Sequence, residues 1–270
     1  MTDLNRAGSW APPTNVDARG CTVFKWVLTP SAMSDIVSCR LPPVLRTYVI
    51  YAEGRIVRRI PAAITPGYED RIAYVYVDNA GGRHALGEYR FREVQRYRPG
   101  NVPTDGSAWI IDLGTVSQSW RSGTLQYGFS LATTRPFIGD VALASFLGAL
   151  LEVGYTDVVC TGFSTHEGKT ARGSSTHVNG TNGDFRYLRN DGRTGPLHLA
   201  YEQARPELLD EARQKALIEA LYRFGWKSML SYRYERDGET RLLARTRHYR
   251  GHYHHLHLQG YEPDMETTNE

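Results

Sequence analysis

The sequence predicts an α+β fold in which a small all-β region precedes a region of mixed helices and strands. Short runs of β-branched and aromatic residues, separated by turn signals such as Glu53-Gly54, fill the first part of the chain. Apolar residues at helical spacing mark the second part. The strands expected in the first part are residues 47–52, 55–60, 72–77 and 84–91.

The chain divides by composition into three expected parts. Residues 1–22 are rich in Gly, Pro, Asn and Asp and are expected to form a flexible leader. Residues 23–104 are expected to form the β-rich domain, with an accessory or adaptor role. The segment 98–103 contains two prolines and a glycine and is the expected linker. The remaining residues, 105–270, are expected to form the functional domain.

Two helices and three strands are expected in the second part. Asp140 can cap a helix that runs to residue 153 and ends at Gly154, and its apolar residues lie nearly all round, which predicts burial. A second helix has Pro206 in its first turn and ends at Gly225. The expected strands are 157–163, 227–234 and 252–259.

Composition excludes several classes of protein. A net charge of +3 from 32 basic and 29 acidic residues gives little support to nucleic-acid binding. Three cysteines without a C-x-x-C pair argue against a disulfide framework and an all-cysteine zinc site. The longest apolar run, 141–151, is too short to span a bilayer, and the first 20 residues lack the apolar segment of a Sec signal peptide. Synthesis in the cytoplasm is therefore expected, with no membrane partner.

Two segments carry residues suited to a metal site. His177 and Asp184 are seven positions apart in a stretch too rich in Gly and Asn to be helical, so a loop can fold both side chains onto one point. In the expected C-terminal strand, His255 and His257 share a face about 7 Å apart. Two histidines and a carboxylate leave a tetrahedral zinc ion with an open position, as in catalytic sites. His166 and His198 remain alternative ligands, whereas His252 and His254 are expected on the opposite strand face.

A zinc ion in such a site would suit amide hydrolysis. It lowers the pKa of bound water toward about 7 and polarises the scissile carbonyl. The leaving amine then needs a proton carrier. His255 is the candidate, because it flanks the site and histidine titrates near neutral pH.

The pattern Ser-x-His-x-x-Gly-x-x-x-Asp from Ser175 to Asp184, followed by His-x-His at His255 to His257, resembles the LAS metallopeptidases. This group includes lysostaphin, the D-Ala-D-Ala peptidases, the Sonic hedgehog domain and, closest in pattern, the penicillin-insensitive murein endopeptidases. The resemblance covers residues 140–262. It implies a small antiparallel sheet flanked by helices, zinc held by His177, Asp184 and His257, and His255 as the catalytic histidine.

The same resemblance implies a peptidoglycan stem peptide or cross-link as the substrate. Many members use an arginine upstream of the first ligand to bind substrate, and Arg172 stands in a comparable place; His166 could also line the site. The D-Ala-D-Ala dipeptidases and carboxypeptidases have a glutamate at the position of His254. This departure favours the endopeptidase or amidase branch.

Three biological settings stay open from the sequence. An exported antibacterial effector, delivered for example by type VI secretion and paired with an immunity protein, is slightly favoured. A phage-type endolysin would use the same chemistry. A binding module that retains zinc without turnover is a third possibility, although His255 argues mildly against it. In the two enzymatic settings the protein acts in the periplasm or cell wall.

Overall fold

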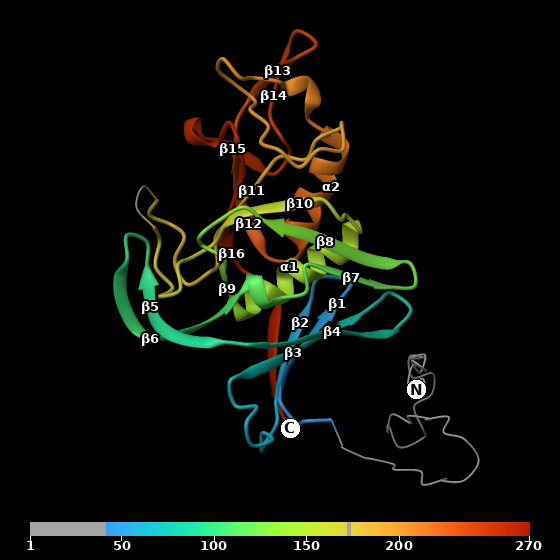
Figure 1. Ribbon diagram of the computed structural model, residues 1–270, viewed down its shortest axis with the longest axis vertical. Helices are drawn as coiled ribbons and strands as arrows, with labels where there is room; N and C mark the ends of the chain where they lie inside the picture. The colour runs from blue at the N-terminus through green and yellow to red at the C-terminus, as the bar shows by residue number, and fades with distance from the viewer. Residues whose placement is uncertain (1–41, 172–173) are drawn as a thin grey trace, which may run out of the picture. The chain divides into compact units, whose positions relative to one another are not determined.

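Strands dominate the described part of the computed structural model, residues 42–171 and 174–270 (Figure 1). This part contains two α-helices, α1 (Asp140–Val153) and α2 (Glu211–Arg223). The expected mixture of helices and strands is therefore confirmed. The leader predicted over residues 1–22 lies outside the described ranges.

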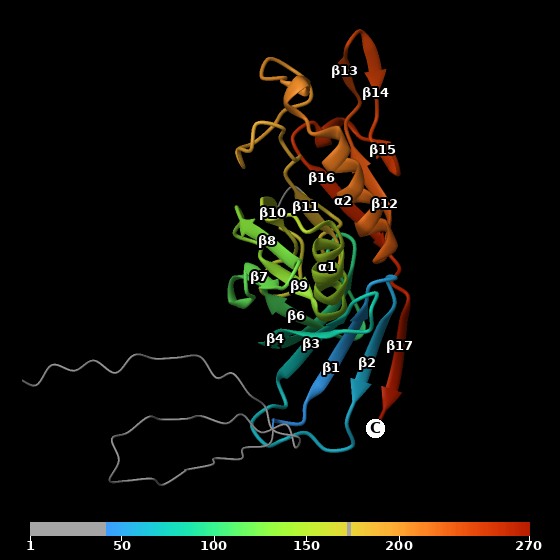
Figure 2. The same cartoon turned by 90° about the vertical axis from the view of Figure 1, so that its right-hand side faces the viewer.

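The four strands expected in the first part are present and belong to a five-stranded sheet with the order β17-β2-β1-β3-β4. Its strands are β1 (Arg46–Tyr51), β2 (Ile56–Ile60), β3 (Arg71–Val77), β4 (Arg83–Arg90) and β17 (Met265–Asn269). The last of these comes from the end of the chain and runs parallel to β2, with Met265 opposite Ile56 (Figure 2). The sheet formed by the first strands is thus completed by the C-terminal residues.

The expected linker is instead the turn of a β-hairpin. Strands β5 (Arg92–Arg98) and β6 (Val102–Asp112) pair antiparallel, and β9 (Phe137–Gly139) joins β6 to make a three-stranded sheet. Gly100 and Asn101 reverse the chain with φ values of +81° and +61°. Proline and glycine occur both in linkers and in the turns of hairpins, so the predicted linker is in fact a turn.

Residue 104, the expected end of the first domain, lies inside β6. Residues 45–270 cluster as one compact unit. The accessory or adaptor role of residues 23–104 stays a prediction.

A seven-stranded sheet with the order β15-β12-β16-β11-β10-β8-β7 occupies the second part. Its central strands β10, β11, β16 and β12 are antiparallel, while β8 and β15 lie parallel to their partners β10 and β12. The strands are β7 (Ser119–Ser122), β8 (Leu125–Leu131), β10 (Val158–Gly162), β11 (Gly183–Phe185), β12 (Trp226–Ser231), β15 (Thr246–His248) and β16 (Leu256–Tyr261). The small hairpin of β13 (Tyr234–Arg236) and β14 (Glu239–Arg241) stands apart from it.

Helix α1 has the predicted bounds and is buried over residues 142–151. It packs against β8 of the larger sheet and against β1 of the five-stranded sheet (Figure 2). Gly154 ends it in the left-handed conformation, as expected. The predicted cap is wrong: Gly139 precedes the helix, and the Asp140 carboxylate accepts a 2.6 Å hydrogen bond from the Tyr48 hydroxyl.

Helix α2 begins later than predicted. Pro206 lies in a separate 3-10 turn, Pro206–Leu208, and Asp210 caps α2 by accepting a hydrogen bond from the Arg213 N–H. Two further 3-10 turns are Leu113–Thr115 and Arg250–His252.

The last predicted strand also begins later, at Leu256. Before it, the His252 N–H donates to the Tyr249 carbonyl and the Tyr253 carbonyl accepts from Leu199, so these backbone groups are satisfied outside a strand ladder. The expectation of a strand over residues 252–255 is therefore wrong. Among the described helices, none is long and apolar enough to cross a bilayer.

The contact between α1 and α2 gives a test of this packing. A Cβ added at Gly148 would lie 2.3 Å from the ring of Phe224, which follows α2 directly and is fully buried. We expect Gly148→Ala to lower the free energy of unfolding by about 1–3 kcal/mol, measured by denaturant titration. Gly195→Ala, whose Cβ would meet nothing within 4 Å, is the control. Equal stability of the two variants would contradict the packing.

Candidate metal centre

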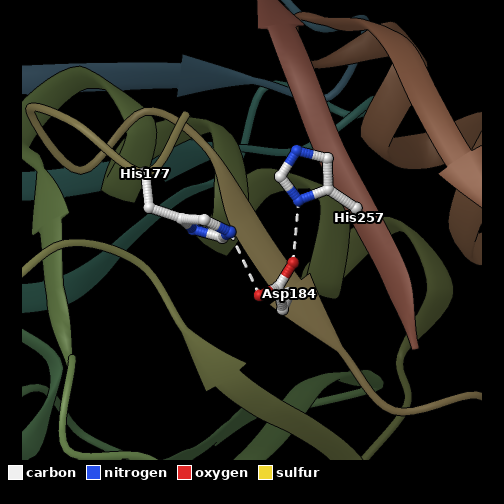
Figure 3. Close-up of side chains that lie close together, drawn as sticks. All are labelled: His177, Asp184 and His257. Atoms are coloured by element: carbon white, nitrogen blue, oxygen red, sulfur yellow. Dashed lines mark hydrogen bonds and ion pairs between the residues drawn. The ribbon is translucent and has the colours of Figure 1, made fainter. Parts of the chain in front are cut away.

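Three elements bring His177, Asp184 and His257 together (Figure 3). Asp184 lies on β11 and His257 on β16, directly opposite each other in the antiparallel register. His177 comes from the loop that precedes β11. One ligand atom from each residue lies within 4.8 Å of the others, and the three residues are 3%, 9% and 4% exposed.

The local sequence explains this convergence. Neighbouring residues on a strand face opposite sides, so Leu256 and Leu258 are fully buried in the core while His257 faces the cavity. Gly180 has a φ of +67°, and a Cβ there would lie 2.3 Å from the Gly139 nitrogen. The loop can therefore turn and approach β9 closely only with glycine at this position.

Asp184 is the charge centre of the group. Its Oδ2 lies 3.1 Å from Nε2 of His177, and its Oδ1 lies 2.8 Å from Nδ1 of His257. Burial alone would raise the pKa of Asp184, but the hydrogen bonds from both histidines outweigh it and hold the pKa well below its ordinary value. The carboxylate is therefore ionised despite its burial.

The partners of the two ring nitrogens of His177 are those expected if a cation is bound. Nδ1 of His177 lies 3.1 Å from the carbonyl oxygen of Asn182, and Nε2 faces the Asp184 carboxylate. Both partners are acceptors, whereas a neutral imidazole has only one N–H. Either His177 is charged while almost fully buried, or Nε2 donates its lone pair to a cation shared with Asp184. His257 can offer Nδ1 in the same way, because its Nε2 lies 3.4 Å from the Thr176 hydroxyl.

The group lies on the wall of a cavity of about 770 Å³. A buried ligand set that opens onto a cavity leaves space for a further ligand or a substrate. The other polar and aromatic lining residues are Arg135, Ser174, Ser175, Thr176, Arg247, His248, Tyr249, His252, His255 and Gln259.

His255 reaches this site although it precedes the strand. Its Nε2 lies 3.5 Å from Oδ1 of Asp184. Burial lowers the pKa of His255 to about 4, against the opposing effect of Asp184, so the value lies below the near-neutral titration expected from sequence. The ring is therefore neutral at pH 7 in the metal-free protein.

Arg135 is a site residue that sequence reasoning missed. Its Nη2 lies 3.4 Å from Oδ2 of Asp184, and its Nη1 donates to the Phe163 carbonyl at 3.3 Å. Gly162 makes room for it, because a Cβ there would lie 2.7 Å from Nη2. Arg135 is 49 residues from Asp184 in the chain, so no local motif links the two.

The other site residues considered from the sequence are three histidines and one arginine. His252 lines the cavity with its ring 5.2 Å from that of His257, because a turn replaces the strand that would have pointed it away. His166 is exposed, packs edge-on against Phe137 and does not line the cavity. His198 contacts Tyr253 and lies outside the ligand group. Arg172 is outside the described ranges, and its role stays a prediction.

The described residues define a mixed α/β protein with a buried His-Asp-His group that can hold a metal ion. No protein-family model matches the sequence, and no curated protein matches it either. The site itself is therefore the basis for assigning a function.

Metal binding is directly testable. We expect the metal-free protein to bind one equivalent of zinc, and zinc at about 100 times its Kd to add about 2.7 kcal/mol to the free energy of unfolding. His177→Ala and His257→Ala should abolish the stabilisation, and a chelator should reverse it. His166→Ala is the matched control, since this exposed histidine lies outside the group. Stabilisation of all variants alike would place zinc elsewhere.

Proposed function

We propose that the protein is a zinc-dependent hydrolase that cleaves amide bonds in peptidoglycan peptides, of the endopeptidase type. The observation that carries the proposal is the buried His177-Asp184-His257 group at the wall of an open cavity, with His255 beside it. Two imidazoles and one carboxylate are a ligand set typical of catalytic zinc.

Zinc bound there would supply a Lewis acid that polarises the scissile carbonyl and acidifies water. His255, neutral and facing the cavity, accepts the proton released from the attacking water and returns it to the leaving amine. Arg135 contacts Oδ2 of Asp184, whereas His257 contacts Oδ1, and the two contacts together restrict rotation of the carboxylate.

The substrate class rests on two supports. The motif from Ser175 to Asp184, with His255 and His257, resembles the LAS metallopeptidases, and the antiparallel strands β10, β11, β16 and β12 are compatible with the sheet of a hedgehog-like domain. Arg135 and Arg247 also line the cavity, and their positive charge suits the carboxylates of a stem peptide. His254 at the position of the dipeptidase glutamate favours cleavage within the peptide over removal of its last residue.

For the biological setting we propose an exported antibacterial effector. An immunity gene next to the coding sequence would support this setting, whereas an adjacent holin gene would support an endolysin.

Digestion of purified sacculi tests the proposal. With zinc present, mass spectrometry should detect new amino and carboxyl termini in the stem peptides, and the glycan strands should remain intact. His177→Ala should remove the activity, and His255→Ala should reduce it about 10²- to 10⁴-fold while zinc still binds. His166→Ala should cleave like the wild type.

Two results would reject the hydrolase. One is zinc and stem-peptide binding without any cleavage, which would identify a non-catalytic module. The other is unchanged cleavage by His177→Ala.

A further inference from the structure

The loop that carries His177 is attached to the β5–β6 hairpin by an asparagine side chain. We call residues 174–182 the metal loop. Asn179 lies two residues after His177, and its Oδ1 accepts a 2.9 Å hydrogen bond from the Tyr97 N–H of β5. Its Nδ2 donates to the Tyr97 carbonyl at 2.7 Å. One side chain thus pairs with both backbone groups of one residue.

A second asparagine makes a similar contact in the opposite direction, from the hairpin to the chain before the metal loop. Asn101, in the turn of the hairpin, accepts a 2.8 Å hydrogen bond from the Thr170 N–H and donates to the Thr170 carbonyl at 3.2 Å. Beside it, the Gly100 N–H donates to the Ser175 carbonyl at 2.8 Å. The hairpin therefore holds the backbone on both sides of His177.

Asparagine suits both positions for two physical reasons. Asn101 and Asn179 have φ values of +61° and +56°, a left-handed conformation that asparagine adopts more readily than most residues. Its amide also carries a donor and an acceptor, like a peptide group, so it can bond the N–H and C=O of one residue together. Aspartate lacks the donor, and glycine lacks the side chain.

Strand β5 contributes little to the hydrophobic core, because all seven of its residues are exposed or half-buried. Its contacts with Asn179 of the metal loop are hydrogen bonds. The same three-stranded sheet contacts the loop once more through β9, where the Gly139 N–H donates to the Gly180 carbonyl at 2.9 Å. The sheet of β5, β6 and β9 is thus a scaffold against which the metal loop is held.

We infer that Asn101 and Asn179 are positioning residues: Asn179 fixes the metal loop and Asn101 fixes Thr170 just before it, so that His177 faces Asp184. This inference rests on the metal site of the proposed function. His257 and Asp184 are aligned by strand pairing, but His177 has no ladder to align it. Hydrogen bonds outside the ligand set orient ligands and raise metal affinity.

The test compares zinc affinity and the absorption spectrum of bound cobalt(II) in full-length variants. Asn101→Gly and Asn179→Gly keep a residue that tolerates positive φ and remove the side-chain bonds. Each should weaken zinc binding about tenfold and alter the cobalt spectrum, while the metal-free proteins melt near the wild-type temperature. Gln95→Ala is the matched control, because Gln95 bonds only to carbonyls within the hairpin, those of Arg96, Thr104 and Gly106.

The outcomes separate this inference from the proposed function. If the wild type binds no metal, the proposed function fails. If the wild type binds zinc and both glycine variants bind it equally well, or if Gln95→Ala loses as much affinity, the inference is overturned. Should the glycine variants not fold, Asn101→Asp keeps an acceptor for the Thr170 N–H but replaces the donor by a second oxygen and adds a negative charge. An unchanged affinity together with an unchanged cobalt spectrum in that variant also overturns the inference.

Discussion

The pairing of β11 with β16 is the constraint on which the site depends. Asp184 and His257 stand opposite each other across these strands, and the leucines that flank His257 are buried in the core. A shift of the register by one residue would turn His257 into the core and a leucine into the cavity. The packing that stabilises the sheet therefore also aligns the backbones of two of the three candidate ligands.

Burial of an ionised carboxylate is the second constraint, because it demands positive charge nearby. Asp184 meets this demand with the charged Arg135 and with His177 and His257. The histidines can satisfy it by carrying a proton or by sharing a metal ion. Since Nδ1 of His177 already faces a carbonyl, a metal ion satisfies the group without placing a charged imidazole in the interior.

The sequence was informative where local pattern decides structure. The extent of α1 and the approach of His177 to Asp184 followed from periodicity and glycine placement. The choice of His257 as the third ligand was implied by the resemblance of the motif. Contacts between residues far apart in the chain could not be predicted from the sequence. Arg135 reaches Asp184 only through the fold, and β17 is an exposed, mainly polar strand that pairs through its backbone with β2. The turn at residues 99–101 was misread because proline and glycine punctuate linkers and hairpins alike.

Charge in the cavity links the site to its proposed substrate. Among the described lining residues, Asp184 is the one carboxylate, while Arg135 and Arg247 each carry a positive charge. A divalent cation bound beside Asp184 would make the cavity strongly positive, and a partly enclosed cavity strengthens its field relative to open solvent. Peptides that carry free carboxylates near the scissile bond are then favoured over neutral ones. Stem peptides have this character, so the charge of the cavity is compatible with the proposed substrate.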